Sequence, residues 1–578
     1  MRLIKLSSNI ASFKTVEFNP VGLTLIVGSK TVSDGKKAAN ADKTYNGVGK
    51  SLLIELIHFC LGATSKPVFN EVIPSWVFTL DFEISGVLYS ASRNTSKQNK
   101  VVLNNQEYSI AKFKKILEEK LFRIPADTGN LTFRALISKF IRSGISSYIV
   151  PDKTVSDYSD YDALIRNTFL LGIDTDLVQE KNLLRKQYTE TDNLIKSFEK
   201  DSVIRSFFKG DLDVDITLKD SFEEVKRLEE EQLKFEVAGN YYDIQQEADE
   251  LANKTFSLKN EIVLIRNAIS SIDSSLRQRP DISRDRLLNL YAEVRAAFQP
   301  ETIKHLADVE TFHNELLANR VARFSREKLK LMDELTKSEA QLAVDLSELD
   351  RLIGLLGNSR ALDQFVTVSN RISELKAECQ KLLDYKELKQ TYSDNLANIG
   401  TKLNNAIIRT NAYLVDCKSD IDEKLEPFRF FSKKIYPKAP AGITLKNNEG
   451  DNQIRFDLDI RIQNDSSDGV NEVRIFCFDM TLLLARSNHD VGFVVHDSRM
   501  YGHIDPRQRA TLFRIADEVS RKLGFQYIAT LNEDHIESMR SEFSEDEMKT
   551  IFTDNTKLFL KDDSPSSKLL GIQVDLKY

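Results

Sequence analysis

With 578 residues, the chain is too long for one typical domain, so at least two folding units are expected. The net charge is −7, but Lys and Arg outnumber Asp and Glu within residues 1–175; this surplus is compatible with polyanion binding, is far from the footprint of a dedicated DNA-binding domain, and decides nothing alone. The longest apolar stretch, near Leu52–Ala63, is too short to span a bilayer and Met1–Lys5 shows no leader pattern, so we expect a cytoplasmic protein without membrane insertion.

Residues 1–175 are predicted to form an α/β lobe. Alternating or β-branched runs predict strands at Leu3–Leu6, Thr15–Phe18, Leu23–Val27, Trp76–Ile84 and Val87–Arg93. Helical spacing of apolar residues predicts helices at Ser51–Leu61, Ile110–Leu121 and Thr132–Arg142. The mixture indicates a globular lobe built on a sheet.

The segment Asn46–Ser51 reads Asn-Gly-Val-Gly-Lys-Ser and leads into an apolar helix. Its glycines let backbone N–H groups turn toward a phosphate, Lys50 can reach the β and γ oxygens, and Ser51 can ligate Mg²⁺. We therefore predict a P-loop that binds ATP and Mg²⁺, against the alternative of a plain glycine-rich turn. The residues predicted to contact the nucleotide are Gly28, Asn46, Gly47, Gly49, Lys50 and Ser51.

The phosphate loop departs from the usual pattern in its first half. The strict motif requires glycine at position 44, where the chain has Thr44, and the glycine that follows the predicted strand is Gly28. We interpret the polar stretch 29–45 as an insertion within the loop. It is either a solvated insertion or a regulatory loop over the nucleotide.

Residues 176–429 are predicted to form a coiled-coil hairpin. Apolar residues recur at heptad spacing, most clearly at Leu342, Leu346, Leu349, Ile353 and Leu356. Glycine-containing segments at Phe207–Leu218 and Ala238–Asn240 predict interruptions, and we place the reversal near 280–300, between Pro280 and Pro300. A plain oligomerisation coil is the alternative for this segment taken alone.

Residues 430–578 are predicted to form a second lobe. The pattern predicts strands at Ile443–Leu445, Ile454–Ile462, Gly492–His496, Gln526–Leu531 and Leu569–Leu576, and helices at Asn471–Arg486 and Pro506–Leu523. Asp497 follows the apolar run 492–496. Because Mg²⁺ held by Ser51 needs a further carboxylate, we predict that Asp497 is the Walker B residue.

A P-loop, a long helical hairpin and a Walker B strand about 450 residues later resemble the SMC/RecN/RecF superfamily of coiled-coil ABC ATPases. The resemblance implies an α/β ABC-type head assembled from N- and C-terminal lobes and split by a long antiparallel coiled coil. It also implies that ATP joins two heads in a homodimer.

Three further segments are assigned through this resemblance. The signature segment of the family is similar to 466–472, where Ser467 and Gly469 match, although a plain helix N-cap explains the serine equally well. The D-loop is similar to the pair that ends at Asp505. The switch strand is similar to 526–532, with Asn532 where the family carries histidine.

The largest departure from the family is Ser498, which replaces the glutamate that ordinarily acts as base for the attacking water. A serine hydroxyl is a poor base, so we expect slow hydrolysis unless Asp505, His496 or Glu533 substitutes. With this replacement and the inserted loop, the chain looks most like short bacterial SMC-like proteins with a C-terminal domain of unknown function. That resemblance implies DNA and a separate effector as partners, in DNA repair or in antiphage or plasmid defence.

Two other functions stay open at this point. One is a structural coiled-coil scaffold whose heads bind no nucleotide. The other is a nuclease, for which the C-terminal lobe offers only scattered carboxylates, at Asp457, Asp459, Glu533 and Asp534.

Overall fold

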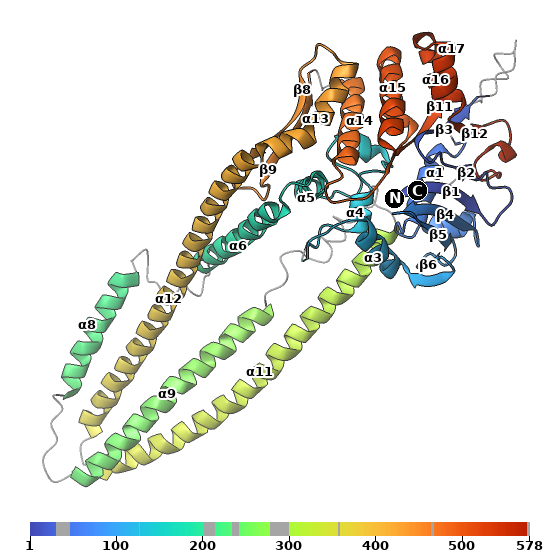
Figure 1. The fold of residues 1–578 in the computed structure, drawn as a ribbon. Coiled ribbons are helices and arrows are strands. Elements are labelled where there is room, and N and C mark those ends of the chain that lie inside the picture. Colours follow the sequence, from blue (N-terminus) through green and yellow to red (C-terminus); the bar gives the residue numbers. More distant parts are fainter. Residues whose placement is uncertain are drawn as a thin grey trace, which may run out of the picture. The chain divides into compact units, whose positions relative to one another are not determined.

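The computed structural model of the chain falls into two compact units. It describes residues 1–30, 45, 47–126, 128–200, 214–233, 242–277, 300–355, 359–463 and 467–574. The head unit joins Met1–Gln187 to Ile399–Tyr578, and the coil unit is Tyr188–Asn398. Both ends of the chain therefore belong to one body (Figure 1). The lobe boundaries at 175 and 429 stay a prediction.

The centre of the head unit is a four-stranded parallel sheet built from both ends of the chain. Its order is β10-β11-β3-β12, with β3 (Gly22–Ser29) between two C-terminal strands. The C-terminal strands are β10 (Phe493–His496), β11 (Gln526–Asn532) and β12 (Thr556–Lys561). All eight residues of β3 are buried, as expected for a parallel strand covered on both faces.

A second sheet of the head unit is antiparallel and has the order β2-β1-β4-β5-β6-β7. Its strands are β1 (Arg2–Ser8), β2 (Val16–Glu17), β4 (Val77–Ile84), β5 (Val87–Asn94), β6 (Lys100–Leu103) and β7 (Gln106–Ser109). Alternate residues of β4 are buried, so one face of this sheet lies on the core. A separate hairpin pairs β8 (Ala441–Asn447) with β9 (Phe456–Ile462).

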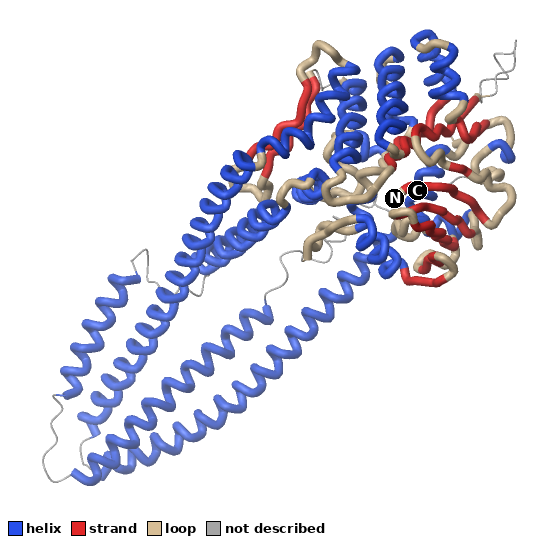
Figure 2. Tube along the Cα trace, viewed as in Figure 1, coloured by secondary structure: helices blue, strands red, loops and turns tan. Residues whose placement is uncertain are grey.

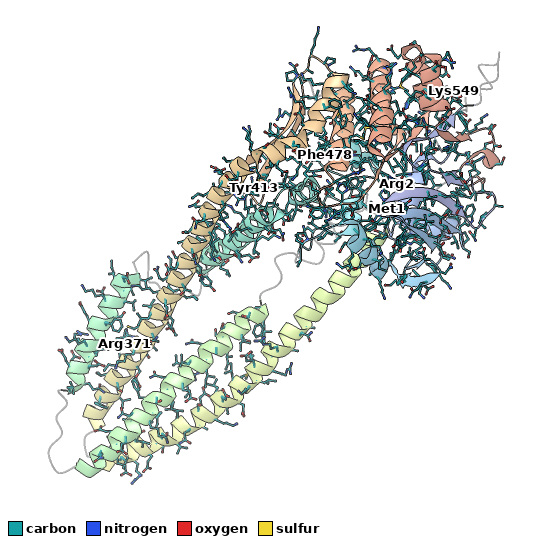
Figure 3. All side chains as sticks on the ribbon, in the orientation of Figure 1. Met1, Arg2, Arg371, Tyr413, Phe478 and Lys549 are labelled. Atoms are coloured by element: carbon teal, nitrogen blue, oxygen red, sulfur yellow. The ribbon has the colours of Figure 1, made fainter. Side chains whose placement is uncertain are left out.

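Helices pack around these strands (Figure 2). They are α1 (Lys50–Cys60), α2 (Pro67–Val72), α3 (Ile110–Leu121), α4 (Phe133–Ile137), α5 (Asp160–Leu171), α13 (Lys418–Ile435), α14 (Asp468–Ala485), α15 (Pro506–Leu523), α16 (Glu533–Met539) and α17 (Glu545–Glu547). One hydrophobic core contains residues from both chain ends, among them Leu25, Ile57 and Phe476. Figure 3 labels Arg2 in the head unit. Its Nη2 donates a hydrogen bond to the carbonyl oxygen of Gly524 at 3.2 Å.

The coil unit is made of long helices that pair in an antiparallel manner. Two of them, α6 (Thr175–Lys200) and α12 (Ser359–Asp416), begin or end in the head unit. The others are α8 (Val214–Leu233), α9 (Tyr242–Arg277) and α11 (Pro300–Leu355). None of the described helices combines the length and the apolar character needed to cross a bilayer.

The buried contacts of the coil unit set its pairing. On α8, Leu218 packs with Leu382, and Leu228 packs in a cluster with Ile372, both of α12. On α9, Ala248 packs with Leu349 and Leu352 of α11. Residue numbers rise along one helix as they fall along its partner, so both pairs are antiparallel. The predicted heptad seam through Leu346, Leu349 and Ile353 takes part in this packing.

Several predicted interruptions of the coil fall outside the described residues. These are Ala238–Asn240 and the reversal near 280–300, of which only Pro300 is described, as the first residue of α11. The interruption predicted at Phe207–Leu218 is wrong for its described part, because Val214–Leu218 is helical. Val214 and Leu218 are one helical turn apart and both pack against α12, which favours a helix over the strand-like alternation of the sequence.

Two predictions in the head unit are also wrong. No strand covers the described residues 569–574, because Gly571 has a φ of +68° and the segment turns. The last strand among the described residues is instead β12, an edge strand in which the exposed Phe559 lies between Leu558 and Leu560 and hides the alternation expected of a strand. The helix predicted at Thr132–Arg142 ends at Ile137. Ile141 instead forms a parallel β-bridge with Val495 of β10.

Buried neutral histidines make the stability of the head unit sensitive to acid. His58 accepts a hydrogen bond at Nδ1 from Arg134 Nη2 at 2.8 Å, and its Nε2 donates to the carbonyl oxygen of Ile141 at 3.1 Å. Burial lowers the pKa of His58 to about 3 and that of His489 to about 4. The unfolded chain takes up a proton on each imidazole near pH 6.5, whereas the folded head does not, so unfolding is favoured below that pH.

We expect each of these two histidines to lower the free energy of unfolding by about 1 to 2 kcal/mol between pH 7 and pH 5. Urea unfolding followed by fluorescence measures this loss, because Trp76 is the single tryptophan and lies buried in the head unit. A His58→Gln variant should lose less stability over this range than the native protein. The control is His503→Gln, at a side chain that is 66% exposed. Equal losses in all three proteins would contradict the assignment.

Candidate functional site

The P-loop connects the described end of β3 to α1. Gly49 is the N-cap of α1 and has a φ of +109°, and Gly47 has a φ of +70°, which only glycine adopts without strain. Lys50 begins the helix, and its side chain lies over Gly28, since a Cβ at Gly28 would be 2.7 Å from Lys50 Nζ. The glycines therefore keep this turn open for the lysine.

The Lys50 ammonium group is buried but has no carboxylate partner. Its Nζ donates a hydrogen bond to the carbonyl oxygen of Tyr45 at 2.5 Å, and the residue is 6% exposed. Among the described residues, no carboxylate oxygen lies within 4 Å of Nζ. Burial lowers the pKa of Lys50 to about 8, although the charges of Asp497 and Asp534 act in the opposite direction. A buried cation of this kind is suited to an anionic ligand.

Asp497 directly follows β10 and meets Ser51 of the P-loop. Ser51 Oγ donates a hydrogen bond to Asp497 Oδ2 at 2.6 Å, across 446 positions of the sequence. Ser498 Oγ donates to Asp497 Oδ1 at 2.9 Å, and the backbone N–H of Asp497 donates to the hydroxyl oxygen of Tyr148 at 2.9 Å. Ser51 of the P-loop and Asp497, which is predicted to be the Walker B residue, therefore meet.

A cavity of about 540 Å³ opens beside these residues. Its polar side is formed by Lys50, Ser51, Asp497, Ser498, Asn532 and His535. No cluster of three or more His, Cys, Asp or Glu residues that could hold a metal occurs among the described residues. The Ser51 hydroxyl and the Asp497 carboxylate nevertheless fit Mg²⁺, because this ion binds oxygen ligands. In nucleotide sites the protein usually supplies only one or two of these ligands, and phosphate oxygens and water supply the rest.

Two polar atoms of residues that line the cavity lack partners within the protein. Asn532 Oδ1 and His535 Nδ1 are buried and accept or donate no hydrogen bond. Each such atom costs roughly 1–3 kcal/mol when it stays unsatisfied, so together they favour a polar ligand here. Asn532, predicted at the switch position, lines the cavity as expected for that role.

His535 is a site residue that the sequence analysis missed. It lies three residues after Asn532, the N-cap of α16, and this spacing places both side chains on one side of the helix. Burial, together with the nearby charge of Arg509, lowers the pKa of His535 to about 4, so the imidazole is neutral near pH 7. The signal in the sequence was the helical spacing of Asn532 and His535.

The remaining predicted residues lie elsewhere. Ser467 is the N-cap of α14 without a side-chain hydrogen bond, and a Cβ at Gly469 would be 2.6 Å from the carbonyl oxygen of His503. Asp505 is the N-cap of α15 and accepts a hydrogen bond from the backbone N–H of Arg507. None of the three lines the cavity. Asn46 and most of the insertion, 31–44, lie outside the described residues.

A buried network of charged and polar groups supports the Walker B strand from behind. Arg142 binds Asp479 of α14 through two hydrogen bonds of 2.5 and 2.6 Å, and both side chains are fully buried. His496 Nε2 donates to Asp479 Oδ2 at 2.9 Å, and His496 Nδ1 accepts from the Tyr527 hydroxyl at 2.9 Å. Although burial alone raises the pKa of Asp479, Arg142 and His496 hold it below its ordinary value.

This network removes His496 from the candidate bases. Burial lowers the pKa of His496, and both ring nitrogens are already used in hydrogen bonds. Glu533 accepts a hydrogen bond from the backbone N–H of Lys30 at 3.3 Å and does not line the cavity. Of the three substitutes considered for the missing glutamate, none lies in the cavity.

The carboxylates considered for a nuclease site have structural partners. Asp457 accepts a hydrogen bond from Asn448 Nδ2 at 2.7 Å, and Asp459 pairs with Arg461 at 2.7 Å, both on β9. Glu533 and Asp534 belong to α16. The four residues form no metal cluster within the described part of the chain.

Two family models match parts of the chain. Residues 7–271 match the AAA domain family, and residues 431–574 match the family described as an uncharacterised protein conserved in bacteria, DUF2326. The first match contains the P-loop and the second contains Asp497. The predicted ATPase-type N-terminal lobe and C-terminal domain of unknown function are therefore both present.

The chain is similar to one curated protein over most of its length, the uncharacterized protein YydD of Bacillus subtilis (strain 168). The two are 21% identical over 560 residues, which are 90% of this chain and 91% of that protein.

Two solved structures are also similar. The Smc head domain with a coiled coil and joint from Pyrococcus yayanosii is 15% identical, with a TM-score of 0.37 over 97% of this chain and 94% of that one. The Smc head domain with an extended coiled coil bound to the C-terminal domain of ScpA, from Pyrococcus furiosus, is 12% identical, with a TM-score of 0.31 over 93% and 91%.

The predicted fold class is confirmed. The chain has an α/β ABC-type ATPase head assembled from its N- and C-terminal lobes and split by a long antiparallel helical coiled coil. The TM-scores of the two solved structures are too low to support this statement. It rests on the sheet order, the P-loop geometry and the match to the AAA domain family.

We expect Asp479→Ala to destabilise the head unit by roughly 3–5 kcal/mol, because it leaves the buried Arg142 without its carboxylate. The matched control is Asp459→Ala, which removes the exposed pair with Arg461 and should change stability by less than about 1 kcal/mol. Urea unfolding followed by Trp76 fluorescence compares the two variants. Similar losses in both would show that the network does not stabilise the Walker B strand.

Proposed function

We propose that this chain binds ATP with Mg²⁺ at the P-loop and that two ATP-loaded heads join as a homodimer. The observation that carries the proposal is the 2.6 Å hydrogen bond between Ser51 and Asp497, beside the buried ammonium of Lys50, which has no carboxylate partner among the described residues. A hydroxyl, a carboxylate and a cation at the N-terminus of α1 are the groups that a magnesium-bound triphosphate requires.

Several of the residues around the cavity have a role in this complex. Backbone N–H groups at Gly47, Gly49 and the start of α1 bind phosphate oxygens, and Lys50 adds a positive charge. When bound, Mg²⁺ would neutralise phosphate charge, with Ser51 and Asp497 as its protein oxygen ligands. Asn532 and His535 supply the unpartnered atoms Oδ1 and Nδ1 on the same side of the cavity.

Hydrolysis in this site is proposed to be slow. Ser498 Oγ donates its hydrogen bond to Asp497, so its proton points at a carboxylate and the hydroxyl is no base for water. His496 is engaged in the buried network, and Asp505 is a helix cap. A slowly hydrolysed nucleotide keeps the engaged state populated for longer.

Ser498→Glu should raise single-turnover phosphate release by about tenfold or more, because a positioned carboxylate supplies the missing base. Ser498→Ala should leave the slow rate of the native protein unchanged. Rapid turnover by the native protein, or loss of its residual activity in Ser498→Ala, would contradict the role given to this position.

The signature residues support a second copy as the partner. Ser467 and Gly469 do not line the cavity of their own head, and the N-terminus of α14 leaves the Ser467 hydroxyl without a capping bond. In the proposed dimer these residues of one copy contact the nucleotide held by the other. The N-terminus of an 18-residue helix favours an anionic group.

DNA and a separate effector subunit complete the proposal. We expect the engaged heads and coils to hold DNA and to signal to the effector, in DNA repair or in antiphage or plasmid defence. This step rests on the resemblance of the P-loop, the coil and the Walker B strand to SMC-like ATPases.

ATP with Mg²⁺ should convert the protein into a dimer, and linear or circular DNA should raise the dimeric fraction. Light scattering after size exclusion measures this directly. Lys50→Ala should stay monomeric because it binds no ATP, whereas Ser467→Arg, at an exposed position, should bind ATP and yet stay monomeric. Dimers of Lys50→Ala that depend on ATP would refute the proposal.

A further inference from the structure

The C-terminal segment 568–574 forms one wall of the cavity. Lys568, Leu569, Leu570, Ile572 and Val574 all line it, on a stretch that follows β12. These residues carry no part of the P-loop or the Walker B motif. Their place beside the nucleotide site therefore needs its own explanation.

Hydrogen bonds hold this segment against the P-loop. The backbone N–H of Leu569 donates to the carbonyl oxygen of Val48 at 3.1 Å, and the carbonyl oxygen of Leu569 accepts from the N–H of Lys14 at 2.9 Å. Ser12 Oγ donates to the carbonyl oxygen of Leu570 at 2.8 Å. The segment is thus tied to both the P-loop and the turn after β1.

Side-chain packing makes the same connection. A Cβ at Gly49 would be 2.4 Å from Leu569 Cβ, so Leu569 fills the space next to the N-cap of α1. Leu569 is fully buried and Leu570 is 2% exposed. Gly571, with a φ of +68°, then turns the chain so that Ile572 and Val574 also reach the cavity. The wall is therefore a built part of the head.

The residues that line the cavity differ in chemistry. Lys50, Ser51 and Asp497 are polar, whereas Ile572 and Val574 of the C-terminal segment are aliphatic, beside Lys568 of the same segment. Tyr45 also lines the cavity, and its backbone carbonyl oxygen accepts the Lys50 hydrogen bond. A nucleoside triphosphate has the same division, since its phosphates are charged and the faces of its base are apolar.

We propose that the nucleobase of ATP packs against Ile572 and Val574, so that the C-terminal segment supplies the base subsite. This inference rests on the proposed function, because the phosphates must first be held at the start of α1. Burial of the base faces on aliphatic side chains adds affinity for the nucleoside and none for the phosphates.

The test compares two probes, ATP and inorganic tripolyphosphate, each with Mg²⁺, by isothermal titration of the full chain. The double variant Ile572→Ala/Val574→Ala changes only partly buried side chains, so the fold should persist. It should weaken ATP binding by about tenfold, or about 1.4 kcal/mol, and change tripolyphosphate binding by less than about twofold. The matched control is Phe559→Ala, on β12 and 53% exposed, which should change neither.

Each other outcome has a defined meaning. Unchanged ATP binding, or equal weakening of both probes, would overturn the base subsite. Tighter ATP binding would also overturn it, because the segment would then obstruct the cavity. Lys50→Ala should weaken both probes; if it binds both as the native protein does, the proposed ATP site itself fails, whatever the double variant shows.

Discussion

The hydrogen bond from Ser51 to Asp497 joins parts of the chain that are 446 residues apart, and the head unit depends on that meeting. The strand before the P-loop, β3, pairs with β11 on one side and β12 on the other, so its neighbours in the sheet come from beyond the coil. Without the C-terminal lobe, β3 would expose both of its edges and a fully buried row of side chains. The two lobes therefore form one fold.

The coil explains how such distant segments meet at little entropic cost. A flexible connection loses about 0.6 kcal/mol for each doubling of its length when its ends are brought together. Antiparallel helices instead bring the ends of an insertion back to the same end of the rod, as the pairing of α8 with α12 and of α9 with α11 does within the coil unit. Ion pairs between the helices, such as Lys376 with Glu229 at 2.6 Å, fit the same register.

The surroundings of the cavity divide into satisfied and unsatisfied polar groups. Behind the Walker B strand, Arg142, Asp479 and His496 satisfy one another in a fully buried network, which fixes the strand that ends at Asp497. In front of it, Asn532 and His535 keep buried atoms without partners. A protein retains such groups where a ligand satisfies them, and this contrast supports the proposal that a ligand binds on the P-loop side of the cavity.

The sequence was most informative where the signal was local. The P-loop, Asp497 and the heptad seam follow from residues that are neighbours in the chain, and the structure brings the first two together. The Arg142–Asp479–His496 network could not be predicted, because its members are far apart and none has an unusual neighbourhood. The edge strand β12 and the turn at Gly571 were missed for a related reason. The exposure of an edge strand, and the packing of the C-terminal segment beside the P-loop, are set by tertiary contacts and not by neighbouring residues.

The central claim is that Ser51 and Asp497 share one magnesium-bound triphosphate. Equilibrium dialysis of ATP with and without Mg²⁺, for the native protein and for Asp497→Asn, tests it most directly. We expect Mg²⁺ to strengthen ATP binding by the native protein and this gain to be lost in Asp497→Asn. An equal gain from Mg²⁺ in both proteins, or no ATP binding by the native protein, would contradict it.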